Sequence, residues 1–362
     1  AVAPAIDIDR LIDELEPGLE PPRLQRRPRG VLVAAAAALI VILGASHFLT
    51  RSADIIAFKT GLGRSFIGVV LLATATSLPE LGTGISSVTL VDEPDLAVGT
   101  VFGSNMFNLF IIGLLDLFWR DGPILTRVGT TSILVAGLGI LIISLGAAAN
   151  VIHNTTNVLS AWYISPFSIL MLVFFLAAMY AIFRFEQSHE RDKSRSPDHE
   201  YAPARLSGAA LTYLVSAAVI LGSALWLANT GDRIADEMGW EASYVGTQFL
   251  AFSTSLPELA TSIAAIRLIA PELAIANLLG SNLFNMGLIL FLDDLAFTEG
   301  AIWAAVSEIH TLSGAIAILM TVAVIIALMN RRRKRLSKLI TGESMLLIGL
   351  YVAASLTVFY LS

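Results

Sequence analysis

The pentapeptide Thr-Ser-Leu-Pro-Glu occurs at residues 76–80 and again at residues 254–258, each time inside a long apolar stretch. Each copy is followed by the motif Gly-Ser-Asn-x-Phe-Asn, at residues 103–108 and 280–285. A carboxylate is costly inside hydrocarbon, so a glutamate retained at the same depth in both copies indicates a functional site. Duplicated membrane units that meet at a polar centre are typical of secondary transporters.

The composition is that of an integral membrane protein. Of the 362 residues, 56% are hydrophobic and 14% are charged, and the mean hydropathy is +0.75. Soluble domains contain about 25% charged residues. The chain has no cysteine, which excludes disulfides, thiolate metal sites and cysteine nucleophiles. The net charge of −6 is modest and does not indicate a nucleic-acid partner.

Ten apolar stretches are long enough to cross a bilayer, which takes about 20 residues per helix. We therefore predict an all-α integral membrane protein with ten transmembrane helices. The predicted helices lie near residues 31–50, 66–90, 96–118, 128–148, 162–183, 207–228, 243–268, 272–296, 309–329 and 343–361.

The two halves of the chain repeat one another. Residues 43–88 align with residues 221–266 without a gap, and one residue is missing from the second copy before its Gly-Ser-Asn motif. Five predicted helices precede the second copy, and because this number is odd, the second copy enters the membrane in the opposite orientation. We expect a polar N-terminal segment with a short amphipathic helix, a first five-helix repeat, a hydrophilic linker and a second five-helix repeat, at residues 1–30, 31–183, 184–206 and 207–362.

Lys and Arg are unevenly divided between the predicted loops. Most of the 23 basic residues fall on the side of the membrane that contains the linker at residues 184–206. Cytoplasmic loops are enriched in Lys and Arg. We therefore expect a multi-pass protein of the cell (plasma or inner) membrane, with the linker in the cytoplasm and both termini outside.

The motif residues are spaced so that their oxygen atoms converge. In each copy a hydroxyl lies four residues before a carboxylate or an amide, on the same helical face; the pairs are Thr76–Glu80, Thr254–Glu258, Ser104–Asn108 and Ser281–Asn285. The prolines free backbone carbonyls in the same region. Two carboxylates among neutral oxygen ligands suit hard cations such as Ca²⁺, Na⁺ or Mg²⁺. If the hydroxyls and amides served only to join helices, the two matched glutamates would have no explanation.

On these two motif pairs the chain resembles the cation/Ca²⁺ exchanger superfamily, specifically the prokaryotic Na⁺/Ca²⁺ exchangers and their two alpha-repeats. The resemblance implies antiport of Na⁺ against Ca²⁺ by alternating access, with Glu80 and Glu258 binding both ions at mid-membrane. It also implies ligands among the neighbouring hydroxyls and carbonyls. The predicted metal-site residues are Glu80, Glu258, Thr76, Ser77, Thr254, Ser255, Ser104, Ser281, Asn108, Asn285, Ala73 and Ala251.

One feature departs from the family pattern. Both Gly-Ser-Asn motifs end in Asn, at Asn108 and Asn285, whereas the prokaryotic exchangers commonly have Asp at one of these positions. Two site carboxylates then remain in place of three, and we expect two monovalent cations per Ca²⁺ and electroneutral exchange. The motif Gly-Asn-Ala-x-Glu of the proton-coupled branch is absent, which favours Na⁺. Exchange of H⁺ for Ca²⁺ or another divalent cation is the alternative.

Other function classes fit the sequence less well. A cation channel needs a continuous pore, usually between symmetric subunits, which an internal inverted pair does not provide. An intramembrane hydrolase is not indicated, because no His-Glu-x-x-His motif occurs and no Ser/His pair lies at membrane depth. We expect no enzyme activity and no cofactor. The expected partners are Ca²⁺ and Na⁺ (or H⁺) as substrates and membrane lipid, for a monomer without a protein or nucleic-acid partner.

Three further carboxylates lie at the ends of the third and eighth predicted helices: Asp116, Asp293 and Asp294. Acidic side chains are common where helices meet the membrane surface, and we interpret all three as interfacial residues.

Overall fold

The computed structural model describes residues 28–119, 122–156, 162–190, 203–238, 250–330 and 341–361. Within these ranges the regular elements are helices, and no β-strand occurs. The predicted N-terminal segment lies outside the described residues except for its last three positions, and so do residues 191–202 of the predicted linker.

Helices of the first half of the chain occupy nearly all the places predicted for them. They are α2 (Pro28–Thr60), α3 (Arg64–Ile67), η1 (Gly68–Leu72), α4 (Ala73–Thr76), α5 (Leu78–Ser86), η2 (Ser87–Val91), α6 (Pro94–Phe118), η3 (Ile124–Arg127), α7 (Thr131–Thr155) and α8 (Pro166–Glu190). Those of the second half are α9 (Leu206–Met238), α11 (Ala251–Thr254), α12 (Leu256–Arg267), α13 (Pro271–Phe284), η6 (Asn285–Ile289), α14 (Leu290–Ala296), η7 (Ile302–Ala304), α15 (Ile309–Met329) and α16 (Gly342–Leu361).

Eight helical stretches in the described part of the chain are long and apolar enough to cross a membrane. Their bounds are Ala36–Thr60, Arg64–Val91, Pro94–Phe118, Thr131–Thr155, Pro166–Ser188, Leu206–Trp226, Pro271–Ala296 and Ile309–Met329. Gly342–Val358 is a shorter apolar helix, and α12 has 12 residues. The protein is therefore an all-helical, multi-pass membrane protein, while the division into ten spans and two repeats stays a prediction.

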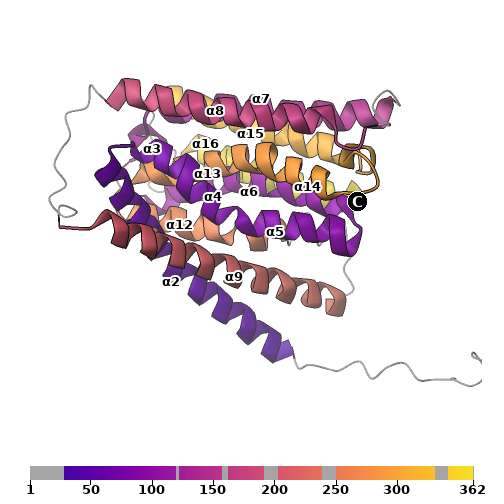
Figure 1. Ribbon diagram of the computed structural model, residues 1–362, viewed down its shortest axis with the longest axis horizontal. Coiled ribbons are helices and arrows are strands. Elements are labelled where there is room, and N and C mark those ends of the chain that lie inside the picture. Colours follow the sequence, from indigo (N-terminus) through magenta and orange to yellow (C-terminus); the bar gives the residue numbers. More distant parts are fainter. Residues whose placement is uncertain are drawn as a thin grey trace, which may run out of the picture.

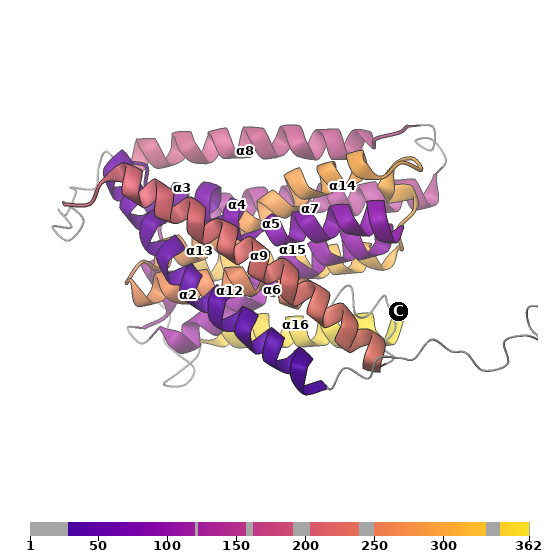
Figure 2. The ribbon, with the colours of Figure 1, turned by 60° about the horizontal axis from the view of Figure 1, so that its bottom comes forward.

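The long helices form a bundle in which two helices differ from the rest in direction. Most run roughly along the longest axis of the molecule, whereas α2 and α9 are tilted and pack against each other on one face (Figures 1 and 2). α8 covers the opposite face, and α6, α13 and α15 lie between (Figure 1). α6 and α13 are the most buried of the eight apolar stretches, so the motif residues on them are shielded from the surrounding membrane.

Each motif helix is interrupted at the serine of the pentapeptide. α4 ends at Thr76 and α5 begins at Leu78, with Ser77 between them at φ −92° and ψ 5°. Ser255, at φ −88° and ψ 7°, separates α11 from α12 in the same way. Each proline then stands in the first turn of the new helix, where its missing N–H costs no helical hydrogen bond. The glutamate that follows it also lies in the first turn, where the helix dipole favours a negative charge.

A glycine of the second Gly-Ser-Asn motif allows the two copies to come into contact. A methyl group added at Gly280 would lie 2.6 Å from Cα and 3.0 Å from the carbonyl oxygen of Val69. Val69 belongs to η1, which precedes the first pentapeptide. The close approach expected of a small residue between membrane helices therefore occurs here between the two halves of the chain.

Replacing Gly280 with Ala is expected to destabilise the protein, because overpacking of this kind costs about 1–3 kcal/mol. The measurement is the thermal unfolding temperature of the purified protein in detergent, which should fall. Gly137→Ala in α7 is the matched control, because nothing lies within 4 Å of its added methyl group and Ala is favoured over Gly in a helix by about 1 kcal/mol. An unchanged unfolding temperature for Gly280→Ala would contradict the contact with η1.

Candidate functional site

The two pentapeptides meet at the centre of the bundle through their carboxylates. Glu80 and Glu258 are both fully buried. Ser77 Oγ donates a hydrogen bond to Glu258 Oε1 at 3.0 Å, and Ser255 Oγ donates to Glu80 Oε1 at 2.9 Å. Each carboxylate is thus held by the serine of the other copy, so the site exists only when both halves of the chain are packed together.

A second pair of hydroxyls comes from the helices that carry the Gly-Ser-Asn motifs. Ser104 Oγ donates to Glu80 Oε1 at 3.3 Å, and Ser281 Oγ donates to Glu258 Oε1 at 3.4 Å. Ser255 Oγ also lies 2.9 Å from Ser104 Oγ. In both carboxylates the same oxygen atom, Oε1, accepts a hydrogen bond from one hydroxyl of each half of the chain. None of these four bonds involves Oε2.

Four buried acceptor oxygens at this centre have no hydrogen-bond partner among the described residues: Glu80 Oε2, Glu258 Oε2, Asn108 Oδ1 and Asn285 Oδ1. They form two matched pairs, one carboxylate and one amide from each copy. A buried acceptor without a partner is costly and rare in folded proteins. Oxygen atoms of this kind, two of them anionic, can coordinate a hard cation.

The amide groups are held by a network that links the two copies. Asn108 Nδ2 donates to Asn282 Oδ1 at 3.0 Å, and Asn285 Nδ2 donates to Asn105 Oδ1 at 3.4 Å. Asn282 Nδ2 in turn donates to the backbone oxygen of Asn105 at 3.2 Å. Because the NH₂ groups of Asn108 and Asn285 point into this network, their carbonyl oxygens remain available.

Asn105 and Asn282 were not among the predicted site residues. They are the third residue of each Gly-Ser-Asn motif, so their repetition in both copies is the feature of the sequence that could have identified them as site residues. Asn277 is another buried amide close to the site: its Nδ2 donates to Thr261 Oγ1 at 3.1 Å, and its Oδ1 lies 3.3 Å from Thr76 Oγ1.

The predicted threonine and alanine ligands make bonds inside their own helices. Thr76 Oγ1 donates to the Leu72 oxygen at 3.0 Å, and Thr254 Oγ1 to the Leu250 oxygen at 2.9 Å. The oxygens of Ala73 and Ala251 accept the backbone N–H groups of Ser77 and Ser255, at 3.0 and 3.1 Å. These groups border the site, and the oxygens of Ala73 and Ala251 also lie 3.5 and 3.4 Å from the hydroxyl oxygens of Thr76 and Thr254.

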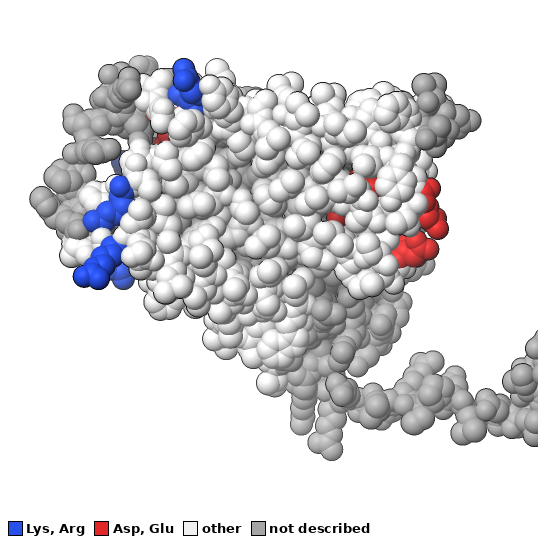
Figure 3. Space-filling model, viewed as in Figure 1, with Lys and Arg blue, Asp and Glu red and all other residues white. Residues whose placement is uncertain are grey.

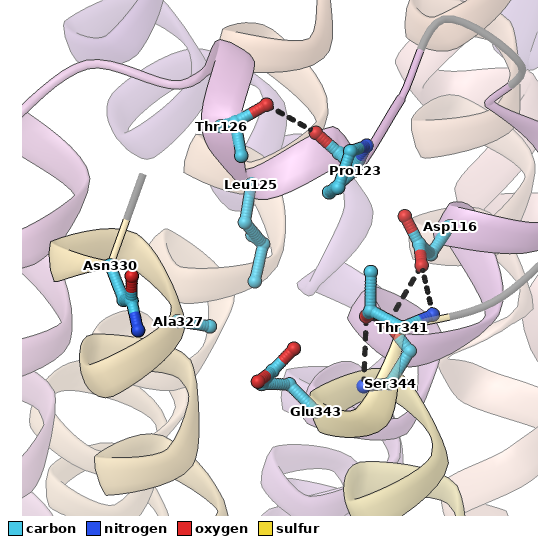
Figure 4. A pocket seen from close by; sticks show the side chains of 9 residues that line it. All are labelled: Asp116, Pro123, Leu125, Thr126, Ala327, Asn330, Thr341, Glu343 and Ser344. Carbon is cyan, nitrogen blue, oxygen red and sulfur yellow. Dashed lines mark hydrogen bonds between the residues drawn. The ribbon is translucent and has the colours of Figure 1, made fainter. Parts of the chain in front are cut away.

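Asp116 and Asp294 lie near the ends of α6 and α14, as predicted, and both are buried within the protein. Asp116 accepts a hydrogen bond from the N–H group of Ile124 at 3.1 Å. It also accepts bonds from the N–H group of Thr341 at 2.9 Å and from Ser344 Oγ at 3.2 Å (Figure 4). It thereby joins the loop after α6 to the start of α16, beside a small cavity that Glu343 and Asn330 also line (Figure 4).

Asp294 does the same for the other half of the molecule. It accepts the N–H groups of Ile302 and Ser165, at 2.7 and 2.8 Å. It joins the loop after α14 to the start of α8. Both carboxylates therefore fasten loops by binding backbone N–H groups that would otherwise be buried without a partner.

Asp293 is also buried, but neither of its oxygens has a hydrogen-bond partner in the described part of the structure. Among the described residues no group of three His, Cys, Asp or Glu side chains could hold a metal ion. The acidic side chains at the centre are therefore Glu80 and Glu258, and the other oxygens around them are neutral.

Charged side chains gather at the two ends of the bundle, basic at one end and acidic at the other (Figure 3). The helix ends and loops near the junction of α8 and α9 carry Lys59, Arg64, Arg127, Arg184, Arg205 and Arg267. The opposite ends of the helices carry Asp92, Glu93, Asp95, Glu299 and Glu308.

Comparison with known proteins agrees with the family resemblance. The family described as "Sodium/calcium exchanger protein" matches residues 30–186 and 208–360. Inner membrane protein YrbG of Escherichia coli (strain K12) is 28% identical over 311 residues, covering 82% of this chain and 87% of that protein. Sodium/calcium exchanger MaX1 of Methanosarcina acetivorans is 25% identical over 348 residues, covering 89% of this chain and 97% of that protein.

The fold is similar to that of a solved exchanger. The sodium-calcium exchanger NCX_Mj, soaked with 10 mM Na⁺ and zero Ca²⁺, superposes with a TM-score of 0.67 at 18% identity, covering 90% of this chain and 97% of that one. The family match extends over both halves of the chain and includes both pentapeptides. The chain belongs to the sodium/calcium exchanger protein family.

Proposed function

We propose that the protein exchanges Na⁺ for Ca²⁺ across the membrane by alternating access, at a cation site centred on Glu80 and Glu258. Membership of the exchanger family supports cation/Ca²⁺ exchange in general. The observation that carries the proposal is the reciprocal bonding of the two carboxylates to Ser255 and Ser77, which leaves one oxygen of each without a partner.

Charge balance explains why the two cations would compete for this site. Two buried carboxylates are strongly unfavourable as unpaired anions, and one Ca²⁺ or two Na⁺ would neutralise them equally. Ca²⁺ takes about six to eight oxygen ligands. The carboxylate and amide oxygens without partners would supply four, and the Ser and Thr hydroxyls together with the oxygens of Ala73 and Ala251 would supply the rest. The halves would then rearrange only around a neutralised site.

The structural basis for alternating access would be two inverted five-helix repeats, at residues 31–183 and 207–362, joined by the linker at residues 184–206. The paired contacts support this division. Asp116 and Asp294 each accept the N–H group eight residues later in the chain. Asp116 also binds the start of α16, and Asp294 the start of α8. These are the last helices of the opposite repeats.

The first helices of the two repeats, α2 and α9, are the proposed moving elements. They pack against each other on one face and tilt relative to the other helices (Figure 2). The family resemblance assigns this sliding role to the first and sixth helices. Movement of this pair would open the central site to either end while the other helices stay packed.

The distribution of charge supports the orientation. The basic end, where α8 stops and α9 starts, would face the cytoplasm, which places the linker inside and both termini outside. The acidic end would then face outward, where its negative potential attracts cations. The polar segment at residues 1–30 would lie on that outer side, in a monomer.

Ca²⁺ flux tests the site directly. In vesicles containing the purified protein, an outward Na⁺ gradient is expected to drive ⁴⁵Ca²⁺ uptake, whereas an outward H⁺ gradient alone is not. Glu80→Gln and Glu258→Gln should each reduce uptake at least ~100-fold. Each change removes one carboxylate from the buried pair that it would form with the bound cation, which costs about 3 kcal/mol or more. Glu299→Gln, an exposed residue at the acidic end, is the matched control.

The outcomes of this assay separate the candidate functions. Uptake driven only by H⁺ would support H⁺/Ca²⁺ exchange. Full activity in either glutamine variant would contradict the proposed site, and no Ca²⁺ uptake under either gradient would contradict Ca²⁺ transport.

Electrical measurement tests the stoichiometry. Because Asn108 and Asn285 leave two carboxylates at the centre, exchange of two Na⁺ for one Ca²⁺ should be electroneutral, and a potassium diffusion potential should not change the rate of ⁴⁵Ca²⁺ uptake. Asn285→Asp adds a third carboxylate and should make uptake sensitive to the potential, while Asn330→Asp, an exposed position, should not. Uptake by the unaltered protein that follows the membrane potential would refute the electroneutral scheme.

A further inference from the structure

Asp293 has no acidic counterpart in the first repeat, where Leu115 precedes Asp116. Asp116 lies eight residues after Asn108, but its equivalent Asp294 lies nine residues after Asn285. In the first repeat α6 is a continuous α-helix, whereas the second repeat has the π-helical turn η6 at Asn285–Ile289. A π-helical turn accommodates an extra residue within a helix and occurs frequently at functional sites. Asp293 follows this turn and directly precedes Asp294, at the place where the first repeat has Leu115.

The carboxylate of Asp293 lies against a glycine of the first motif helix. A methyl group added at Gly84 would be 2.5 Å from Asp293 Oδ2 and 2.6 Å from Oδ1. The side chain is fully buried, and neither oxygen has a hydrogen-bond partner in the part of the chain that the structure describes. The absent side chain at Gly84 thus provides the space that the carboxylate occupies.

This position lies between the central site and the acidic end. Gly84 follows Glu80 by four residues in α5, so both are on the same helical face, about 6 Å apart along the axis. From Gly84 the helix continues into η2 and ends next to Asp92 and Glu93. Asp293 therefore stands between the central carboxylates and the acidic end of the bundle.

No cation compensates this carboxylate from the elements packed against it. α14 packs mainly on α5, α6, α8, η2, η6 and η7, and their only Lys or Arg is Arg184, near the far end of α8 and about 27 Å from its start. The titratable residues on these elements are Glu80, Asp95, Asp116, Tyr180, Arg184, Glu186, His189 and Glu190. Asp294, the next residue in the chain, accepts hydrogen bonds from two backbone N–H groups. His153 Nε2 lies 2.9 Å from Ser165 Oγ.

A proton fits this site better than a metal ion. An unpaired, buried carboxylate is strongly unfavourable as an anion. A Na⁺ or Ca²⁺ ion would need several oxygen ligands, but no group of three acidic or histidine side chains in the described residues surrounds Asp293. A proton needs one oxygen atom.

We propose that Asp293 is a proton-binding site that controls access from the acidic end to the central cation site. With the proton bound, the side chain stays buried against Gly84 and this side is closed. When the proton leaves to water at the acidic end, the charged carboxylate draws water in and opens the path. The proton returns to the side from which it came, so the exchange of Na⁺ for Ca²⁺ keeps its stoichiometry. This inference rests on the proposed function.

Protons could also compete with Ca²⁺ at Glu80 and Glu258, but saturating Ca²⁺ suppresses that competition. Flux at saturating Ca²⁺ therefore tests access to the site separately. The maximal ⁴⁵Ca²⁺ uptake of the unaltered protein should fall as pH is lowered. Asp293→Asn mimics the protonated side chain, so its maximal uptake should be low and should lose this pH dependence. Asp92→Asn is the matched control, because Asp92 is exposed at the same end with φ 59°, a conformation that Asn tolerates. A maximal uptake of Asp293→Asn that follows pH as in the unaltered protein would overturn the proposal.

A stability measurement tests the proton site without relying on transport. A proton bound in the folded protein and not in the unfolded chain stabilises the fold at low pH, and this stabilisation is lost as pH rises. The thermal unfolding temperature of the purified protein should therefore fall with rising pH more steeply than that of Asp293→Asn, and the variant should be the more stable at high pH. Equal pH dependence in both proteins would overturn the proton site even where Ca²⁺ transport is intact. If Ca²⁺ flux is absent, the difference in pH dependence still supports proton binding at Asp293.

Discussion

The structure depends on stabilising two carboxylates inside a membrane protein. A buried carboxylate needs hydrogen-bond donors or a cation, and in this molecule the donors come from the opposite half of the chain. Ser77 serves Glu258 and Ser255 serves Glu80. The breaks in the motif helices follow from the same requirement, because they expose serine hydroxyls and place each glutamate at a helix N-terminus. The glycine contact between Gly280 and η1 brings the halves close enough for these bonds to form.

The charge of the centre depends on the two amide side chains, Asn108 and Asn285, being neutral. Asn108 and Asn285 use their NH₂ groups to join the two copies through Asn282 and Asn105, which leaves two neutral carbonyl oxygens beside the two carboxylates. An aspartate at either position would give up the donor and add a negative charge. Asn in place of Asp at these positions therefore affects both the packing between the halves and the number of monovalent cations needed for neutrality. The third buried carboxylate of this region, Asp293, lies outside this centre and has a different environment.

The helical class, the position of nearly every helix and the meeting of the motif residues could be predicted from the sequence, because hydropathy marks the helices and an exact duplication marks the site. The partners of each side chain could not. Helical spacing places Thr76 on the same face as Glu80, but it does not reveal that Ser77 binds the glutamate of the other copy. The sequence places Asp116 and Asp294 at helix ends, but it does not reveal that they are buried there. Their burial depends on loops that return from elsewhere in the chain.

The position of Asp293 illustrates the same limit. A helical period read from the sequence assumes 3.6 residues per turn. It therefore does not reveal the π-helical turn at η6 or the contact of Asp293 with Gly84 that follows it. The same applies to Asn105 and Asn282, whose importance lies in contacts between helices that only the folded chain brings together.

The most direct test of the account is the position of a bound divalent cation. Crystals of the protein grown with Sr²⁺ as a stand-in for Ca²⁺ would give an anomalous diffraction peak at the bound ion. The account predicts one peak between Glu80 Oε2 and Glu258 Oε2, within coordination distance of both, and no peak there in Glu258→Gln. A divalent ion found only elsewhere in the protein, or retained at this position without the second carboxylate, would contradict it.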